Sequence, residues 1–179
     1  TLTAVVGDDA VNVTTAARWF DYATGGKVKL NGHSIELQGF SHHPSFAGMG
    51  AMTNPRLALF QAQTTKALGV NFWRTSHNPY EDAVYEVLTA VGVMCWDENR
   101  NFGSDHAPEY ADMIRAHRSH PSVLIWGMCN ERQCGAEQGA AAKAFRAVQL
   151  SLDPDRPQTG NMVQGQDFNF PHVDIITES

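Results

Sequence analysis

A carboxyl side chain stands just past an apolar stretch that has the length of a buried strand. The stretch is Val123–Trp126, and Asn130 and Glu131 follow it closely. A carboxyl group held against apolar neighbours such as Met128 has a raised pKa, so it can donate a proton near neutral pH. Beside it, the Asn130 amide could hold a substrate hydroxyl. The alternative is that Glu131 caps the next helix or pairs with Arg132, and the preceding strand favours the chemical interpretation.

A second candidate group lies in Asn71–Pro79, which reads Asn-Phe-Trp-Arg-Thr-Ser-His-Asn-Pro. Arg74 ends a predicted strand there, and a guanidinium at such a place can orient a carboxylate and keep it ionised. His77 could bind a substrate hydroxyl. The competing hypothesis is a structural ion pair of Arg74 with Asp97 or Glu98, and spacing alone leaves both open.

Histidines raise the alternative of a metal site, because strand ends of barrels can supply His and carboxylate ligands to zinc. The candidates are His42, His43 and His77. Adjacent histidines on an extended segment point to opposite faces, so His42 and His43 make a poor ligand pair. The sequence has neither His-x-His nor His-Glu-x-x-His. We therefore expect no bound metal and no cofactor.

The cysteines are Cys95, Cys129 and Cys134. An odd count in a domain of this size argues against a disulfide framework. Cys95 and Cys129 lie at the ends of apolar runs, so we expect them to be buried thiols. Cys129 and Cys134 do not form a Cys-x-x-Cys pair, and no zinc site is expected there.

Composition limits the class of protein that must carry these groups. The chain has 179 residues, of which 42% are hydrophobic and 18% charged, with a net charge of −6. This composition is typical of a globular domain, and the absence of a Lys/Arg cluster argues against a nucleic-acid partner. No apolar stretch approaches the ~20 residues that span a bilayer, so no membrane partner is expected. Thr1 is not an initiator Met and no leader follows it, so we expect a piece of a longer protein.

The elements that position these groups change character along the chain. Before Gly39 the pattern predicts short strands, with Asn31-Gly32 as a hairpin signal. These strands are Ala10–Thr14, Arg18–Tyr22, Lys27–Leu30 and Ser34–Gln38. After Gly39 helices and strands alternate. The predicted helices are Pro55–Leu68, Ala83–Val91, Pro108–Arg118 and Ala136–Leu152. The predicted strands between and after them are Val70–Arg74, Val93–Asp97, Ser122–Trp126, Gln158–Asn161 and Val173–Thr177.

Short apolar strands separated by helices indicate a parallel sheet, either doubly wound or closed as a (β/α)8 barrel. No glycine-rich phosphate loop follows any strand, which weakens the nucleotide-binding version. Polar residues cluster after the strands, as in Asp97-Glu98-Asn99 and Asn130-Glu131. A barrel carries its active site at these strand ends, so the pattern favours an unfinished barrel of five or six strands.

At this point three stretches resemble glycoside hydrolase family 2, which includes β-galactosidases, β-glucuronidases and β-mannosidases. Leu30–Phe40 resembles the hairpin that enters the family's barrel, and Asn71–Pro79 its Asn-x-x-Arg-Thr-Ser-His-Tyr-Pro signature. His117–Glu131 resembles its Arg-Asn-His-Pro-Ser-(apolar)-Trp-x-x-x-Asn-Glu signature. Ala10–Tyr22 resembles the end of the family's immunoglobulin-like domain. The resemblance thus implies residues 1–24 as the end of that β-domain and residues 25–179 as the first part of the barrel.

The resemblance also implies roles for single residues. Glu131 matches the family's acid/base, and Asn130 matches the residue beside it that contacts the sugar 2-hydroxyl. Arg74 matches the arginine that contacts the nucleophile. His77 and His43 match histidines that line the sugar pocket.

Other positions depart from the family or match it more loosely. Asp97 stands where the family often has an Asp-Glu pair after the third strand, and we expect it to bind substrate. The magnesium ligands of the β-galactosidases should fall near Phe102 and Ser104, which cannot serve as such ligands. The family's nucleophile follows the seventh strand. Glu178 comes too early in the barrel, so we expect that it is not the nucleophile.

Together these features predict a retaining β-glycosidase, β-galactosidase-like, whose partner is a carbohydrate substrate and which could form oligomers. β-Glucuronidase or β-mannosidase specificity remains an alternative. So do a non-catalytic carbohydrate-binding barrel and a metal-dependent hydrolase. Residues 1–179 alone are expected to be inactive and poorly stable, because an open parallel sheet exposes edge strands and apolar surface.

Overall fold

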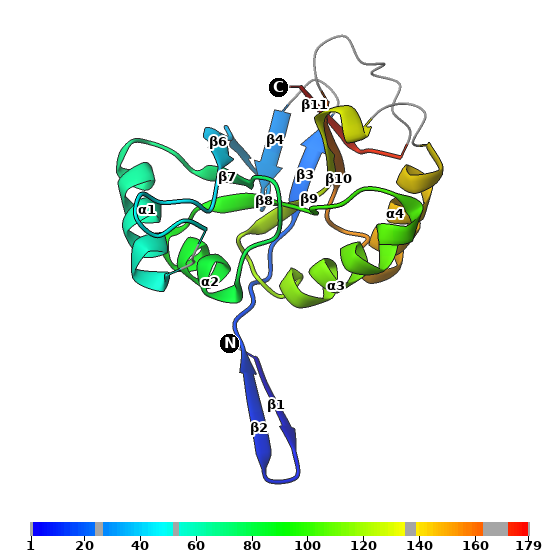
Figure 1. Cartoon of the computed structure of the whole chain (residues 1–179). Coiled ribbons are helices and arrows are strands. Elements are labelled where there is room, and N and C mark those ends of the chain that lie inside the picture. Colours follow the sequence, from blue (N-terminus) through cyan, green and yellow to red (C-terminus); the bar gives the residue numbers. More distant parts are fainter. Residues whose placement is uncertain (1, 24–26, 52–53, 135–138, 163–171, 179) are drawn as a thin grey trace.

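Parallel strands form the main sheet of the computed structural model, which describes residues 2–23, 27–51, 54–134, 139–162 and 172–178 (Figure 1). These strands are β6 (Gly39–His42), β7 (Phe72–Thr75), β8 (Met94–Glu98), β9 (Val123–Asn130), β10 (Gln158–Met162) and β11 (Ile175–Glu178). Each pairs in parallel with the next one along the chain. A doubly wound sheet reverses its strand order at a switch point, whereas a (β/α)8 barrel does not. The predicted partial barrel is therefore confirmed, with six strands in the described ranges.

Helices connect the strands from β6 to β10 and lie on one side of the sheet (Figure 1). They are α1 (Pro55–Ala67), α2 (Asp82–Val91), α3 (Ala107–His117) and α4 (Gly139–Leu152), with the short turns η1 (Ser104–His106) and η2 (Glu131–Cys134). Helix α1 begins where the sequence predicts, since the Asn54 side chain accepts a hydrogen bond from the Arg56 backbone N–H at 2.9 Å. Residues 136–138 of the predicted fourth helix lie outside the described residues. Within the described ranges, none of these helices combines the length and the apolarity needed to cross a membrane.

Two apolar clusters cover the two faces of the sheet. On the helix side, Trp73, Trp126 and Tyr85 are fully buried and form part of the larger cluster. On the concave side, Trp96 and Leu124 form a smaller cluster with other side chains. Because successive residues of a strand point to opposite faces, strands packed on both faces are apolar throughout. This explains why the sequence of the strands shows runs of apolar residues rather than alternation.

The first residues form two small antiparallel sheets. β1 (Leu2–Val6) and β2 (Asp9–Val13) make a hairpin that projects away from the rest of the chain (Figure 1), and β1 was not predicted. β3 (Phe20–Ala23), β4 (Lys27–Leu30) and β5 (His33–Ile35) make the second sheet. Phe20 of β3 packs in the concave cluster of the barrel. The division at residue 24 stays a prediction, as does the immunoglobulin-like origin of the hairpin.

The cysteines differ from the expectation. Cys95 is a buried free thiol, as predicted, but Cys129 is bonded to Cys134 in a disulfide. The end of β9 and the η2 turn bring the two Cα atoms to 5.5 Å, within the range that a disulfide spans. An odd number of cysteines leaves at least one unpaired, and it does not exclude a local bridge across a turn. The prediction of a free Cys129 was therefore wrong.

Candidate active site

The carboxyl ends of β7, β8 and β9 bring an arginine, a carboxylate and an amide together. Arg74 Nε donates to Glu98 Oε2 at 2.6 Å, and Arg74 Nη2 donates to Glu98 Oε1 at 3.0 Å. Both side chains are buried. The same Nη2 group donates a hydrogen bond to Asn130 Oδ1. Three neighbouring strands are thus linked through one guanidinium, which a barrel achieves because its parallel strands end at the same rim.

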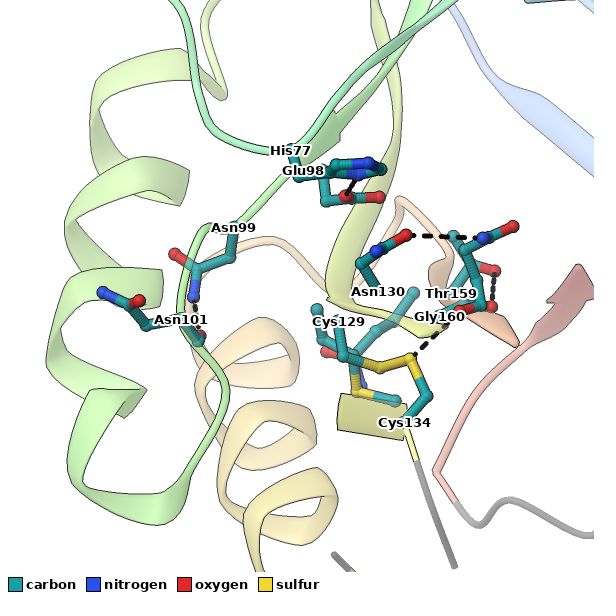
Figure 2. Close-up of a disulfide and its surroundings, with 12 residues drawn as sticks. His77, Glu98, Asn99, Asn101, Cys129, Asn130, Cys134, Thr159 and Gly160 are labelled. Carbon is teal, nitrogen blue, oxygen red and sulfur yellow. Dashed lines mark hydrogen bonds and ion pairs between the residues drawn. A yellow bond between two sulfur atoms is a disulfide. The ribbon is translucent and has the colours of Figure 1, made fainter. Parts of the chain in front are cut away.

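His77 joins this group from the loop after β7. Its Nδ1 atom lies 2.7 Å from Glu98 Oε1, as an N–H donor to the carboxylate (Figure 2). His77 also lines the cavity in which Asn130 and Glu131 lie. Burial raises the pKa of Glu98 above its ordinary value, and the hydrogen bonds from Arg74 and His77 oppose that shift.

The aromatic ring of Trp96 packs against the guanidinium of Arg74. The Arg74 guanidinium carbon lies 4.7 Å from the ring centre of Trp96, in the geometry of a cation–π contact. Gly127 makes room for Trp96, because a Cβ atom at this position would lie 1.8 Å from the indole nitrogen. The site therefore depends on a glycine in β9 that the sequence alone did not identify as necessary.

An irregularity in β9 returns Asn130 to the concave face. Gly127 pairs with Thr159 and Asn130 with Asn161, so β9 has one residue more than β10 over this stretch. As a result Met128 and Cys129 both enter the core on the helix side. The contact of Met128 with Glu131 that we expected is therefore not made, and Glu131 is exposed.

Glu131 lies at the mouth of this group of side chains. It begins η2 with a φ of 52°, a left-handed conformation that residues other than glycine adopt uncommonly. A cavity of about 320 Å³ is lined by His77, Arg100, Asn101, Asn130, Glu131 and Gln133. The structure thus brings Glu131, Asn130, His77 and Arg74 together, as the sequence predicted. Asn130 and Glu131 thus share this cavity with polar side chains.

The two adjacent histidines point apart, as expected. His42 is buried, its ring stacks on Trp73 at 4.1 Å between ring centres, and its Nδ1 atom lies 3.1 Å from the Tyr80 hydroxyl. Burial lowers the pKa of His42 to about 4. His43 is exposed, and its ring meets the ring of His77 edge-on at 5.2 Å. His43 therefore borders the candidate site, whereas His42 belongs to the core.

Asp97 is the predicted site residue that the structure places elsewhere. Its side chain is fully buried on the helix side of β8. It accepts hydrogen bonds from the Tyr85 hydroxyl at 2.6 Å and from the His117 ring at 2.7 Å. Neighbouring residues of a strand point to opposite faces, so Glu98 rather than Asp97 faces Arg74. The expectation that Asp97 binds substrate is corrected accordingly, and Glu98 is the site carboxylate that the sequence analysis missed.

No group of three or more His, Cys, Asp or Glu side chains in the described part of the chain is placed to hold a metal ion. Phe102, near the position expected for β-galactosidase magnesium ligands, instead packs its ring on Phe145 at 5.1 Å between ring centres.

Known proteins resemble this chain over most of its length. The β-glucuronidase of Bacteroides fragilis is 26% identical over 158 residues, which are 79% of this chain and 23% of that protein. The human β-glucuronidase is 28% identical over 162 residues, which are 82% of this chain and 25% of that protein. The chain thus spans about a quarter of the length of these relatives.

Solved structures show the same fold. A glycosyl hydrolase family 2 member from Bacteroides cellulosilyticus superposes with a TM-score of 0.88 at 22% identity, over 98% of this chain and 25% of that one. A β-glucuronidase from Bacteroides uniformis superposes with a TM-score of 0.86 at 24% identity, over 96% and 24%. The family model "Glycosyl hydrolases family 2, TIM barrel domain" matches residues 23–109 and 102–177. Because this match extends over most of the sequence, the chain belongs to glycosyl hydrolase family 2.

Proposed function

We propose that the protein containing this chain is a retaining β-glycosidase and that Glu131 is its general acid/base. The observation that carries this proposal is the grouping of Asn130 and Glu131 with His77 around one cavity, beside the Arg74–Glu98 pair. Such a rim offers a proton donor at its mouth and hydrogen-bonding groups for sugar hydroxyls. That combination is what cleavage of a glycosidic bond requires.

In the first step, the Glu131 carboxyl protonates the glycosidic oxygen while a second carboxylate attacks the anomeric carbon and the carbon–oxygen bond breaks. In retaining enzymes the second carboxylate lies about 5 Å from the first and forms a glycosyl-enzyme. In the second step, the Glu131 carboxylate removes a proton from water. The water oxygen then attacks the anomeric carbon and releases the second carboxylate. We assign the second carboxylate to the residue after the seventh strand.

The neighbours of Glu131 take supporting roles. We assign the Asn130 amide, whose oxygen accepts a hydrogen bond from Arg74, to a hydroxyl of the sugar. We assign His77, which lines the cavity, and His43, whose ring contacts the ring of His77, to binding of the sugar. Arg74 is paired with the Glu98 carboxylate, so we assign it a positioning role: it holds the Asn130 side chain at the rim.

We propose a β-glucuronide as the substrate. The relatives named above are β-glucuronidases, so they support this specificity over the β-galactoside expected from the sequence. A panel of 4-nitrophenyl β-glycosides, offered to the complete protein, tests the choice. The proposal expects the largest kcat/KM for the glucuronide. A larger value for the galactoside or the mannoside would contradict it.

The role of Glu131 is tested with E131A in the complete protein. A 4-nitrophenyl leaving group needs no protonation, whereas a methyl leaving group does. E131A should therefore lose about 10²–10⁴-fold in kcat/KM on the methyl glycoside, the contribution typical of general acid catalysis. The loss on the 4-nitrophenyl glycoside should be much smaller, and azide should restore its turnover. The control is E86A, the same substitution at an exposed glutamate on α2. Equal losses on both substrates without azide rescue would disprove the assignment.

A further inference from the structure

The disulfide encloses the proposed acid/base. Cys129 lies in β9 directly before its last residue, Asn130, and Cys134 ends η2, so Asn130 and Glu131 lie in the loop that the bond closes. Both cysteines are buried, with 0% and 1% of their surfaces exposed. Glu131, between them in the sequence, is exposed. The bridge therefore anchors both ends of the short segment that presents the carboxyl group.

The backbone of the next strand holds the bridge from the other side (Figure 2). A Cβ atom on Gly160 of β10 would lie 2.7 Å from Cys129 Sγ and 3.1 Å from Cys134 Sγ. The first distance is shorter than real Cβ contacts and the second is tighter than most of them, so a side chain at this position would force β10 or the disulfide to shift. The next residue, Asn161, donates a hydrogen bond to Asn130 Oδ1 at 3.4 Å. The disulfide and the Asn130 side chain therefore contact neighbouring residues of β10, Gly160 and Asn161.

The conformation of Glu131 shows why an anchor is needed. Its φ of 52° lies in the left-handed region, which a residue with a side chain retains only where the surrounding structure determines it. A closed ring of six residues, fixed against β10, supplies that determination. Without the bond, the Asn130 side chain would still be held by Arg74 and Asn161, but the backbone after it could relax toward ordinary angles. The carboxyl group would then move relative to the glycosidic oxygen.

We infer that the Cys129–Cys134 disulfide is a positioning device for Glu131, so that full general acid catalysis requires the oxidised form. This inference rests on the proposed function. The cysteines touch no substrate, and they act only through the backbone that carries the carboxyl group. Reduction by a dithiol breaks the S–S bond and gives two protein thiols, while the dithiol is oxidised to its cyclic disulfide.

The test uses C129A/C134A in the complete protein, with C95A as the matched control. Cys95 is also buried, but it is a free thiol away from the bridge. Because a displacement of about 1 Å can cost about 10²-fold in rate, we expect kcat/KM on the methyl glycoside to fall by about tenfold to 10²-fold. On the 4-nitrophenyl glycoside, whose leaving group needs no proton, kcat/KM should stay within about twofold. C95A should show no such difference between the two substrates.

A second measurement covers the possibility that the double variant fails to fold. The wild-type protein is treated with dithiothreitol, the thiols are counted by alkylation and mass spectrometry, and both substrates are assayed before and after re-oxidation. A loss of kcat/KM on the methyl glycoside alone, reversed by re-oxidation, supports the inference. Equal losses on both substrates, no loss after complete reduction, or free thiols at both positions in the untreated active enzyme would overturn it. A wild-type protein that cleaves neither glycoside would instead refute the proposed function.

Discussion

The guanidinium of Arg74 and the carboxylate of Glu98 form a buried pair with two hydrogen bonds, at 2.6 Å and 3.0 Å. Replacing Glu98 by Gln keeps the shape of the side chain but leaves the charge of Arg74 buried without its partner. Breaking such a pair costs about 3 kcal/mol or more. We therefore expect E98Q to lower the free energy of unfolding of the complete protein by this amount in urea titrations.

The same variant should also impair catalysis in the molecules that remain folded. Glu98 fixes Arg74 and His77, and through Arg74 it fixes Asn130. We expect kcat to fall by at least about tenfold, because misplaced groups at a site commonly cost this much. A folded E98Q protein with unchanged kcat and KM would show that Glu98 has only a structural role.

Asp97 should behave differently from its neighbour. D97N removes the charge that accepts hydrogen bonds from Tyr85 and His117, and one of these donors loses a good acceptor. The expected cost is about 1–3 kcal/mol of stability. Since Asp97 faces the helices and not the cavity, kcat and KM of the folded enzyme should stay within about twofold of wild type. A large rise in KM would restore Asp97 to substrate binding and contradict its placement here.

His42 makes stability depend on pH. Its pKa is lowered to about 4 by burial, while its ordinary value in the unfolded chain is 6.5. The unfolded state therefore binds a proton below pH 6.5 that the folded state refuses until about pH 4, so stability falls as the pH falls through this window. Between pH 7 and pH 5 the loss is about 2 kcal/mol. H42N should lose this part of the pH dependence of the unfolding midpoint, and H43N at the exposed neighbour should keep it.

Gly160 and the disulfide should be coupled. G160A places a methyl group against two sulfur atoms that a closed ring prevents from moving, and such overpacking costs about 1–3 kcal/mol. In the C129A/C134A background those sulfur atoms are absent, so the same substitution should cost much less. A double-mutant cycle of unfolding midpoints measures the difference. Additive effects would mean that β10 does not press on the bridge.

Much of this architecture follows from the pattern of the strands. Apolar runs separated by helices predicted the sheet, and polar residues at the strand ends predicted that Arg74, His77, Asn130 and Glu131 would meet. The parallel strands of a barrel end on one rim. Residues at strand ends that are far apart in the sequence can therefore be predicted to be neighbours from the fold alone.

Three features of the structure could not be predicted from the sequence pattern. Choosing between Asp97 and Glu98 requires knowing which face of β8 is concave, and a strand that is apolar on both faces does not reveal this. The extra residue in β9 turns Met128 and Cys129 to the same side, which strict alternation does not allow. The disulfide depends on the tightness of the η2 turn, which is set by tertiary packing against Gly160.

The order of the strands also bears on how the protein is made. Every strand of the main sheet is paired with its neighbour in the chain, so each new strand finds a partner that has already left the ribosome. From β6 to β10 the paired strands are separated by a helix, as Gly39 and Phe72 are, so each parallel pairing must close a long loop and is slow compared with the formation of a helix. β6 has one partner, β7, in the described sheet, and a closed barrel joins its first strand to its last. The first barrel strand to be synthesised is thus the one whose free edge needs protection for longest during translation.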